Sequence, residues 1–297
     1  MGILAIGVLV VPLMYMVAQL VDRFQLHGNT EDSEPGALMA LGTIFGVMLA
    51  IPTGIYIWVT GHSFGGIENF LMLAFNEIFY VVSIYIYLML IKTRDMSKVL
   101  PWFQTIPAFG IVFAFVVLGE KLPTTKILAI SLLVVGGLVL SLQKKGLDKK
   151  MIIFMVISSG LMAVYDVGFA NFGREIDFVS ALFVNMVGKA FWCSLFLIGK
   201  QERKGFTMGL KTRFKLQTVG ELTTIAGDLC SCGFILILPV ALVQGFNCLT
   251  PLFVLIGAII CGKLFPKVFE NEASKGSLLQ RVVGIILMIL GGIILSS

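Results

Sequence analysis

Five ionisable residues lie within long apolar stretches of this 297-residue chain, which are Glu77, Asp166, Lys189, Glu221 and Asp228. At the centre of a bilayer each costs about 2.5 kcal/mol or more on insertion scales, so each requires a partner or a function. Lys189 and Asp228 stand near the middle of consecutive apolar stretches, which places them at similar depth. An Asp–Lys pair there would neutralise both charges. We predict either a fixed salt bridge between two helices or a site whose charges meet a solute.

Polar residues at similar depth extend this candidate site. Gln244 and Asn247 are three residues apart, so they share one helix face, and they precede Pro251, where a kink would free backbone carbonyls. Asp166 could pair with Arg174, because an arginine side chain reaches along a helix. We interpret Glu221 differently, as a helix-start acid wetted by lipid headgroups. The substrate-binding residues that we predict are Lys189, Asp228, Asp166, Glu77, Asn185, Gln244 and Asn247.

These residues require helices that cross a membrane. The chain is 58% hydrophobic and 13% charged, whereas a soluble domain needs about 25% charged residues to cover its surface. We therefore expect an all-α membrane protein with about ten transmembrane helices, each roughly 20 residues long. The predicted spans are 2–22, 37–59, 67–91, 98–118, 123–142, 151–171, 178–199, 216–237, 239–262 and 279–296.

The two halves of the chain repeat one pattern. Glu77 precedes Pro107 by 30 residues, and Glu221 precedes Pro251 by the same 30 residues. The segment VVGGLVLSL ends the first half, and ILGGIILSS ends the second. We therefore predict repeats at 1–143 and 151–297. Because five spans per repeat is an odd number, the repeats are expected to be inverted relative to one another, as in many transporters.

Three segments carry a resemblance to a known family: VDRF at the end of the first span, KVLPWFQTIPAFGIVFAFVVLGEKLP in the fourth and PVALVQGFNCLTPLFVLI in the ninth. They resemble the EamA-like members of the drug/metabolite transporter superfamily. The second half departs from the pattern where Gly262-Lys263-Leu264 replaces Gly119-Glu120-Lys121. The resemblance implies alternating-access transport of small organic solutes, such as amino acids or drugs, through a plasma (inner) membrane. The expected partners are the bilayer, the solute and a coupling proton or cation.

Two other functions remain open. Tyr165-Asp166, Gly227-Asp228 and LPVAL resemble the two-aspartate layout of intramembrane aspartyl proteases, in which paired carboxylates act as acid and base. That layout has a differently placed glycine and an uninterrupted Pro-Ala-Leu. A non-transporting scaffold is the other alternative.

The sequence predicts no enzyme, cofactor or nucleic-acid partner. His27 and His62 lie in loops without a second nearby ligand, so we expect no metal site. The longer loops are expected at Gln25 to Pro35, Lys200 to Lys215 and Lys263 to Gln280. The orientation is open: lysine and arginine concentrate in the odd-numbered loops, which favours outside termini, whereas the family resemblance favours inside termini.

Overall fold

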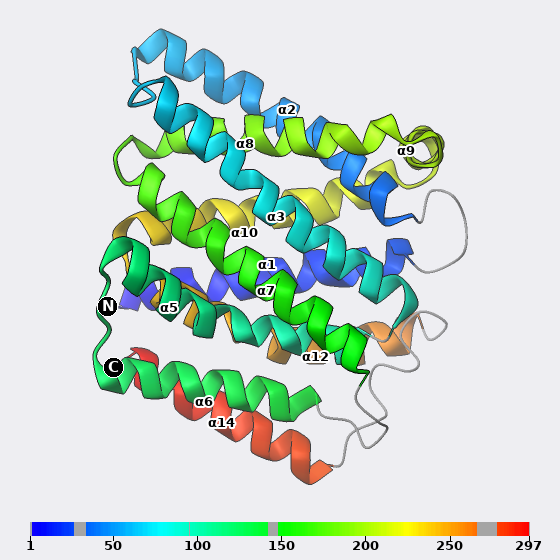
Figure 1. Cartoon of the computed structure of the whole chain (residues 1–297). Coiled ribbons are helices and arrows are strands. Elements are labelled where there is room, and N and C mark those ends of the chain that lie inside the picture. Colours follow the sequence, from blue (N-terminus) through cyan, green and yellow to red (C-terminus); the bar gives the residue numbers. More distant parts are fainter. Residues whose placement is uncertain (1, 27–33, 95, 142–147, 266–277, 297) are drawn as a thin grey trace.

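The computed structural model describes residues 2–26, 34–94, 96–141, 148–265 and 278–296 as an all-helical bundle (Figure 1). Each predicted span is one helix or a run of two or three consecutive helical segments, whose ends lie within a few residues of the expected boundaries. The first half contributes α1 (Gly2–Leu26), α2 (Pro35–Thr60), α3 (Ile67–Thr93), α5 (Ile106–Leu118) and α6 (Thr124–Ser141). The second contributes α7 (Lys149–Gly173), α8 (Phe178–Ser194), α10 (Phe214–Ile237), α12 (Thr250–Leu264) and α14 (Leu278–Ser296).

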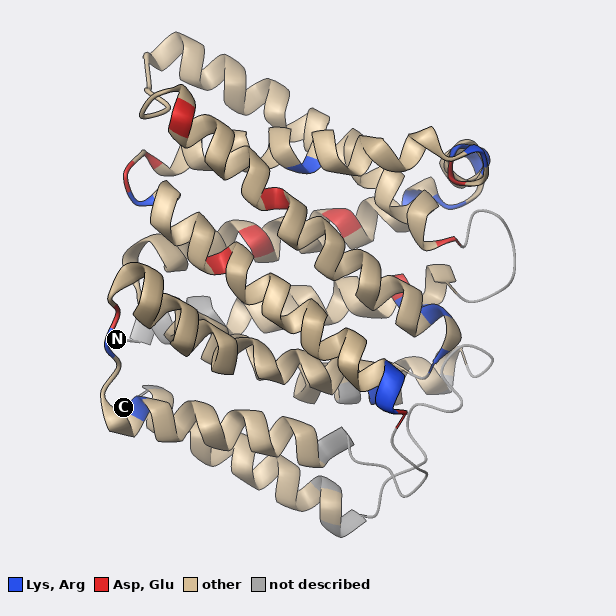
Figure 2. Cartoon of the chain, viewed as in Figure 1, with Lys and Arg blue, Asp and Glu red and all other residues tan. Residues whose placement is uncertain are grey.

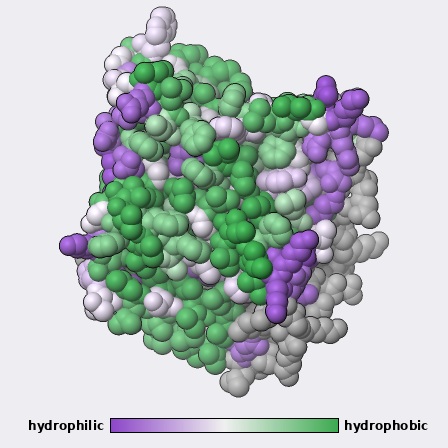
Figure 3. All heavy atoms as spheres, in the orientation of Figure 1, coloured by the Kyte–Doolittle hydropathy of each residue, from purple (hydrophilic) through white to green (hydrophobic). Residues whose placement is uncertain are grey.

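The outer surface of the bundle suits a bilayer. In the described chain, eight helical segments are long and apolar enough to span it, and two shorter apolar stretches occur at Thr124–Val139 and Val282–Leu295. Trp58 is 84% exposed, which favours lipid over water as its surroundings. Apolar side chains dominate the face shown in Figure 3, and most charged residues lie at the two ends of the helices (Figure 2). The chain is a multi-pass integral membrane protein.

The fourth and ninth spans are broken at corresponding places. α4 (Met96–Val99) and the 3-10 helix η2 (Leu100–Thr105) precede α5, and α11 (Val240–Asn247) precedes α12. Pro107 and Pro251 each lie in the first turn of the following helix. Proline lacks the N–H that a first turn leaves unpaired, so it favours a new helix start at both places. Leu100 and Gln104 in η2 and Val243 and Gln244 in α11 are buried, so both interruptions lie in the interior of the bundle.

The main contacts between the halves have counterparts when the two halves are exchanged. α1 packs on α10 and α12 of the second half, and the corresponding α7 packs on α3 and α5 of the first. Two pairs of corresponding helices also meet, which are α2 with α8 and α6 with α14. α1 begins and α14 ends at the same end of the bundle, as an even number of spans requires (Figure 1).

One predicted loop is wrong. The sequence predicts a loop from Lys200 to Lys215, but Lys200–Thr212 form helix α9. The segment is too polar and too short to span a bilayer, and Gly205 and Gly209 are buried while basic residues elsewhere on the helix are exposed. It packs on α2 at one end of the bundle. An amphipathic pattern of this kind is typical of helices that lie at a membrane interface.

Candidate functional site

A cavity of about 180 Å³ lies between the two halves, lined by residues from α1, α2, α3, η2, α5, α7, α8, α10, α11 and α12. Its lining carries five charged side chains: Asp22, Asp166, Lys189, Glu221 and Asp228. Four of them belong to the set of buried charges identified in the sequence, and Asp22 is additional. The cavity is therefore the place where the costly charges of this chain converge.

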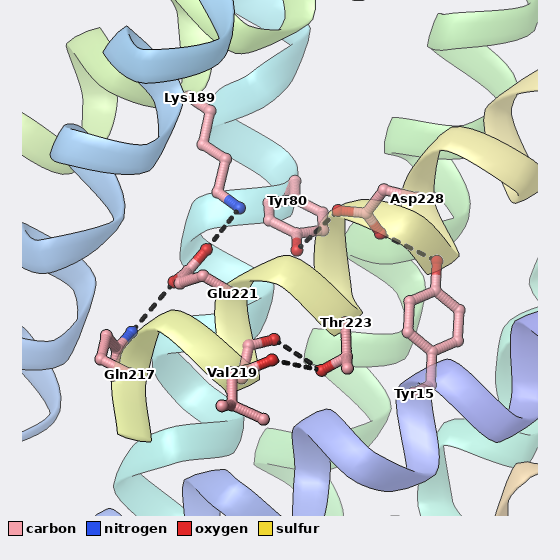
Figure 4. A network of polar contacts seen from close by, with 9 residues as sticks. Tyr15, Tyr80, Lys189, Gln217, Val219, Glu221, Thr223 and Asp228 are labelled. Carbon is pink, nitrogen blue, oxygen red and sulfur yellow. Dashed lines mark hydrogen bonds and ion pairs between the residues drawn. The ribbon is translucent and has the colours of Figure 1, made fainter. Parts of the chain in front are cut away.

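Lys189 pairs with Glu221, so the predicted pairing with Asp228 is wrong. The Lys189 Nζ lies 3.3 Å from Glu221 Oε2 and 5.6 Å from the centre of the Tyr80 ring. Gln217 Nε2 donates to the other oxygen of Glu221 at 3.1 Å (Figure 4). Glu221 is only 14% exposed, so its interpretation as a headgroup-wetted acid is also wrong. Glu221 and Asp228 are seven residues, or two turns, apart on one face of α10, so the helix face alone does not decide which of them meets Lys189.

Asp228 is held by two tyrosines from the first half of the chain. Tyr15 on α1 donates its hydroxyl to Asp228 Oδ1 at 2.9 Å, and Tyr80 on α3 donates to Oδ2 at 3.4 Å (Figure 4). Both tyrosines line the cavity. The carboxylate thus connects helices of the two halves at the centre of the bundle.

Asp166 is held by a glutamine, and its predicted partner Arg174 lies elsewhere. Gln244 Nε2 on α11 donates to Asp166 Oδ2 at 2.8 Å. Arg174 instead forms an ion pair with Glu120 at 2.8 Å. The arginine follows the last turn of α7, so its side chain extends to the end of the bundle and not back to the cavity. Asn247 also lines the cavity, and its amide nitrogen lies 3.5 Å from Ser231 Oγ.

Glu77 and Asn185 lie behind the cavity wall. Neither belongs to its lining, although Tyr165, which contacts Asn185, does. Asn185 Nδ2 donates to the Glu77 carboxylate and to the Tyr165 hydroxyl, the latter at 2.7 Å. Glu77 is 1% exposed. These two residues can fix the position of Tyr165 but do not themselves face the cavity in this structure.

Sequence reasoning missed one face of α1. Tyr15, Gln19 and Asp22 follow one another at intervals of four and three residues, and all three line the cavity. This spacing is typical of a single helix face, and it was the signal that could have found them. Asp22 was overlooked because an acid near a helix end can usually reach water.

The two halves line the cavity at matching positions. Eight lining residues of α3, η2 and the start of α5 have partners one repeat interval, 144 residues, further along the chain that also line it. Glu77 and Glu221 are separated by the same interval. The first half supplies Tyr80, Ile84, Tyr87, Leu88, Leu100, Phe103, Gln104 and Ile106, and the second Thr224, Asp228, Ser231, Cys232, Gln244, Asn247, Cys248 and Thr250. At all eight pairs the first-half side chain is the larger one, and seven of the eight first-half side chains are aromatic or aliphatic, so the cavity has one aromatic and apolar wall and one more polar wall.

The ends of the helices also match. Arg23 at the end of α1 donates to the carbonyl of Ile91 at 2.6 Å and to that of the C-cap residue of α3. Arg174 after α7 donates to the carbonyl of Ile235 at 2.8 Å and to that of the C-cap residue of α10. A cation satisfies the unpaired carbonyls at a helix C-terminus. α3 and α10 end at opposite ends of the bundle, so each end carries one such arginine cap (Figure 1).

The remaining predictions concern metals and proteolysis. Among the described residues, no group of three or more His, Cys, Asp or Glu side chains is placed to hold a metal ion. His62 lies 3.3 Å from Asp177 in the loops at one end of the bundle, and His27 lies outside the described residues. No hydrogen bond joins Asp166 to Asp228 within the described chain, whereas a protease dyad shares a proton between its carboxylates.

Part of the chain matches a known protein family. Residues 5–142 match the EamA-like transporter family. The resemblance predicted from the sequence is confirmed, and the matched segment is the predicted first repeat. Members of this family transport small solutes across membranes.

The chain was also compared with curated protein sequences and with solved structures. No curated protein matches the sequence. The crystal structure of another protein is similar, with a TM-score of 0.64 and 13% identity over 99% of this chain and 96% of that chain. At this identity the similarity shows the fold alone, and it confirms the predicted class.

Proposed function

We propose that this protein carries small organic solutes, such as amino acids or drugs, across the plasma (inner) membrane by alternating access. The observation that carries the proposal is the central cavity, which both halves line at matching positions. A site on the boundary between two repeats is exposed to either side of the membrane when one half rocks against the other. The energy comes from an ion gradient or from the gradient of the solute itself.

The structure supports this movement at three places. The interrupted α4–η2–α5 and α11–α12 spans place helix ends beside the cavity. The arginine caps of α3 and α10 hold equivalent helix ends within each half, at opposite ends of the bundle. The exchange-symmetric packing of the helices supports two inverted repeats, for which the inward-open and outward-open states are related by exchanging the conformations of the halves.

Within the cavity we assign solute contact to Asp228, Asp166, Gln244 and Asn247. Lys189, paired with Glu221, shapes the field on the α8 side of the cavity. Glu77 and Asn185 act indirectly, by positioning Tyr165. A coupling proton or cation would bind at one of the same carboxylates, since these are the ionisable groups that the cavity offers.

Solute exchange by purified protein in liposomes tests this proposal. Liposomes are loaded with unlabelled amino acids, organic amines and organic acids in turn, and uptake of the corresponding labelled compound is measured. We expect saturable exchange of at least one compound, at least tenfold slower with Asp228→Asn and unchanged with Glu68→Gln, an exposed acid at the start of α3. Exchange no faster than in protein-free liposomes for every compound would overturn the transport proposal. Unchanged exchange by Asp228→Asn would overturn the site.

A further inference from the structure

We propose that the solute is an amphipathic organic cation, with an ammonium group bound by the second half of the chain and an apolar body bound by the first. This inference rests on the proposed function, because it assigns a solute class to the same cavity. It follows from the charge of the cavity, from its unpaired hydrogen-bond acceptors and from the unequal chemistry of its two walls.

The cavity has an excess of negative groups. Its described lining carries the carboxyl groups of Asp22, Asp166, Glu221 and Asp228 but a single basic side chain, Lys189. Lys189 is already paired with Glu221 at 3.3 Å. No lysine or arginine among the described residues forms an ion pair with the other three carboxyl groups. A buried carboxylate needs either a proton or a positive partner, and a cationic solute would supply that partner.

Unpaired acceptors point to the same conclusion. Gln217 is 5% exposed and lines the cavity, and its Oε1 has no partner in the described structure. Its Nε2 donates to Glu221, which fixes the orientation of the amide. The side-chain oxygens of Gln19 and Asn247 are unpaired in the same way. An amide oxygen can only accept, so a solute that satisfies these atoms must donate, and an ammonium group has up to three donors.

The opposite wall suits an apolar body. Tyr80, Tyr87 and Phe103 occupy positions whose counterparts in the second half are Thr, Ser and Asn. Aromatic rings attract a nearby cation through their π faces and bury the hydrocarbon attached to it. The Tyr80 ring already has the Lys189 ammonium 5.6 Å from its centre, which shows that a cation is accommodated at this wall.

These features disfavour other solute classes. An anion would meet three carboxyl groups that have no basic partner. The carboxylate of a zwitterion would need a free cation, and Lys189 is occupied by Glu221. An inorganic cation would leave the aromatic wall without a partner. The cavity therefore narrows the proposed solutes from amino acids or drugs to amphipathic amines.

Binding to the wild-type protein in detergent tests the solute class without any variant. The probes are 2-phenylethylammonium, phenylalanine, 3-phenylpropionate, methylammonium and sodium chloride, and affinity is measured by calorimetry and thermal stabilisation. The first three share a phenyl ring and differ in charge, whereas methylammonium keeps the charge without the ring. We expect 2-phenylethylammonium to bind at least tenfold tighter than each of the others. Equal or tighter binding of 3-phenylpropionate, phenylalanine, methylammonium or sodium would overturn the inference, as would no binding of the amine.

Variants then locate the ammonium group. Asp228→Asn should weaken binding of 2-phenylethylammonium at least tenfold, and Glu68→Gln should leave it unchanged. The melting temperature of each variant without solute shows whether it is folded. If Asp228→Asn is not folded, the comparison of the probes on the wild-type protein still tests the solute class. An unchanged affinity in folded Asp228→Asn would refute the placement of the ammonium group.

The two proposals fail differently. If liposomes exchange another solute and the amine does not bind, the solute class is wrong and transport stands. If the amine binds but nothing is exchanged, transport is wrong and the binding site stands.

Discussion

Removing Lys189 should destabilise the protein unless Glu221 is neutralised at the same time. The Nζ–Oε2 distance of 3.3 Å corresponds to an attraction of about 5 kcal/mol at an effective dielectric constant of about 20. The side chains are 7% and 14% exposed, so neither charge is well solvated when its partner is lost. Removing one member of such a pair costs about 3–5 kcal/mol, whereas replacing both by neutral residues is often close to neutral. We expect Lys189→Met to cost about 3 kcal/mol.

The double variant Lys189→Met/Glu221→Gln should cost about 1 kcal/mol, because the introduced amide can keep a hydrogen bond to Gln217 and no unpaired charge remains. The free energy of unfolding is measured in mixed micelles titrated with a denaturing detergent, for the wild type, both single variants and the double variant. This cycle isolates the coupling between the two side chains.

A second cycle with Asp228→Asn provides the control. Lys189 and Asp228 share the cavity but form no ion pair in the described structure, so their coupling should be less than half as large. A Lys189–Glu221 coupling below about 0.5 kcal/mol, or a larger coupling to Asp228, would refute the pairing that we describe.

Two further predictions concern packing and pH. Gly188→Ala should cost about 2 kcal/mol of unfolding free energy, because its new Cβ would lie 2.8 Å from the Ala74 carbonyl oxygen, whereas Gly160→Ala, with open space around it, should be neutral or stabilising; equal costs would contradict this close approach. The Met151 N–H and the Arg94 guanidinium lower the pKa of Asp148 at the start of α7, so its stabilising contribution is present at neutral pH and is lost as pH falls below 3.8. Asp148→Asn should therefore lower the melting temperature at neutral pH but not in strong acid, and a difference that grows with acidity would contradict the assignment.

The membrane spans could be predicted because the free energy of crossing a bilayer depends mainly on a continuous run of apolar residues, which the sequence displays directly. A bilayer admits only segments whose backbone is internally hydrogen-bonded and whose side chains are apolar over about 20 residues. The position of Pro251 also indicated a kink in one span. Helix α9 was missed because a short amphipathic helix gains its stability from the surface on which it packs, which the sequence does not display.

The sequence predicted how deep the site residues lie in the membrane, but not which side chains meet one another or face the cavity. Counting residues from the span boundaries placed Lys189 and Asp228 near one level, and both face the cavity. The choice between Asp228 and Glu221 depends on how far α10 lies from α8 and on which rotamer the lysine adopts, neither of which follows from spacing. The depth of Glu77 predicts a cavity residue, but its side chain is buried between helices.

The internal repeat contains positions at which the two halves match in residue type and positions at which they differ. At the helix ends the halves match in kind: proline starts α5 and α12, and arginine caps the carbonyl groups at the ends of α3 and α10. Where they line the cavity, the halves match in position but not in chemistry, with Thr224 and Asp228 at the positions that correspond to Tyr80 and Ile84. An inverted repeat with identical walls would present the same groups twice and favour a solute with its own two-fold symmetry. The difference between the walls gives the cavity a polar and an apolar side, so a solute can bind in one orientation while the surrounding helices retain two equivalent ends.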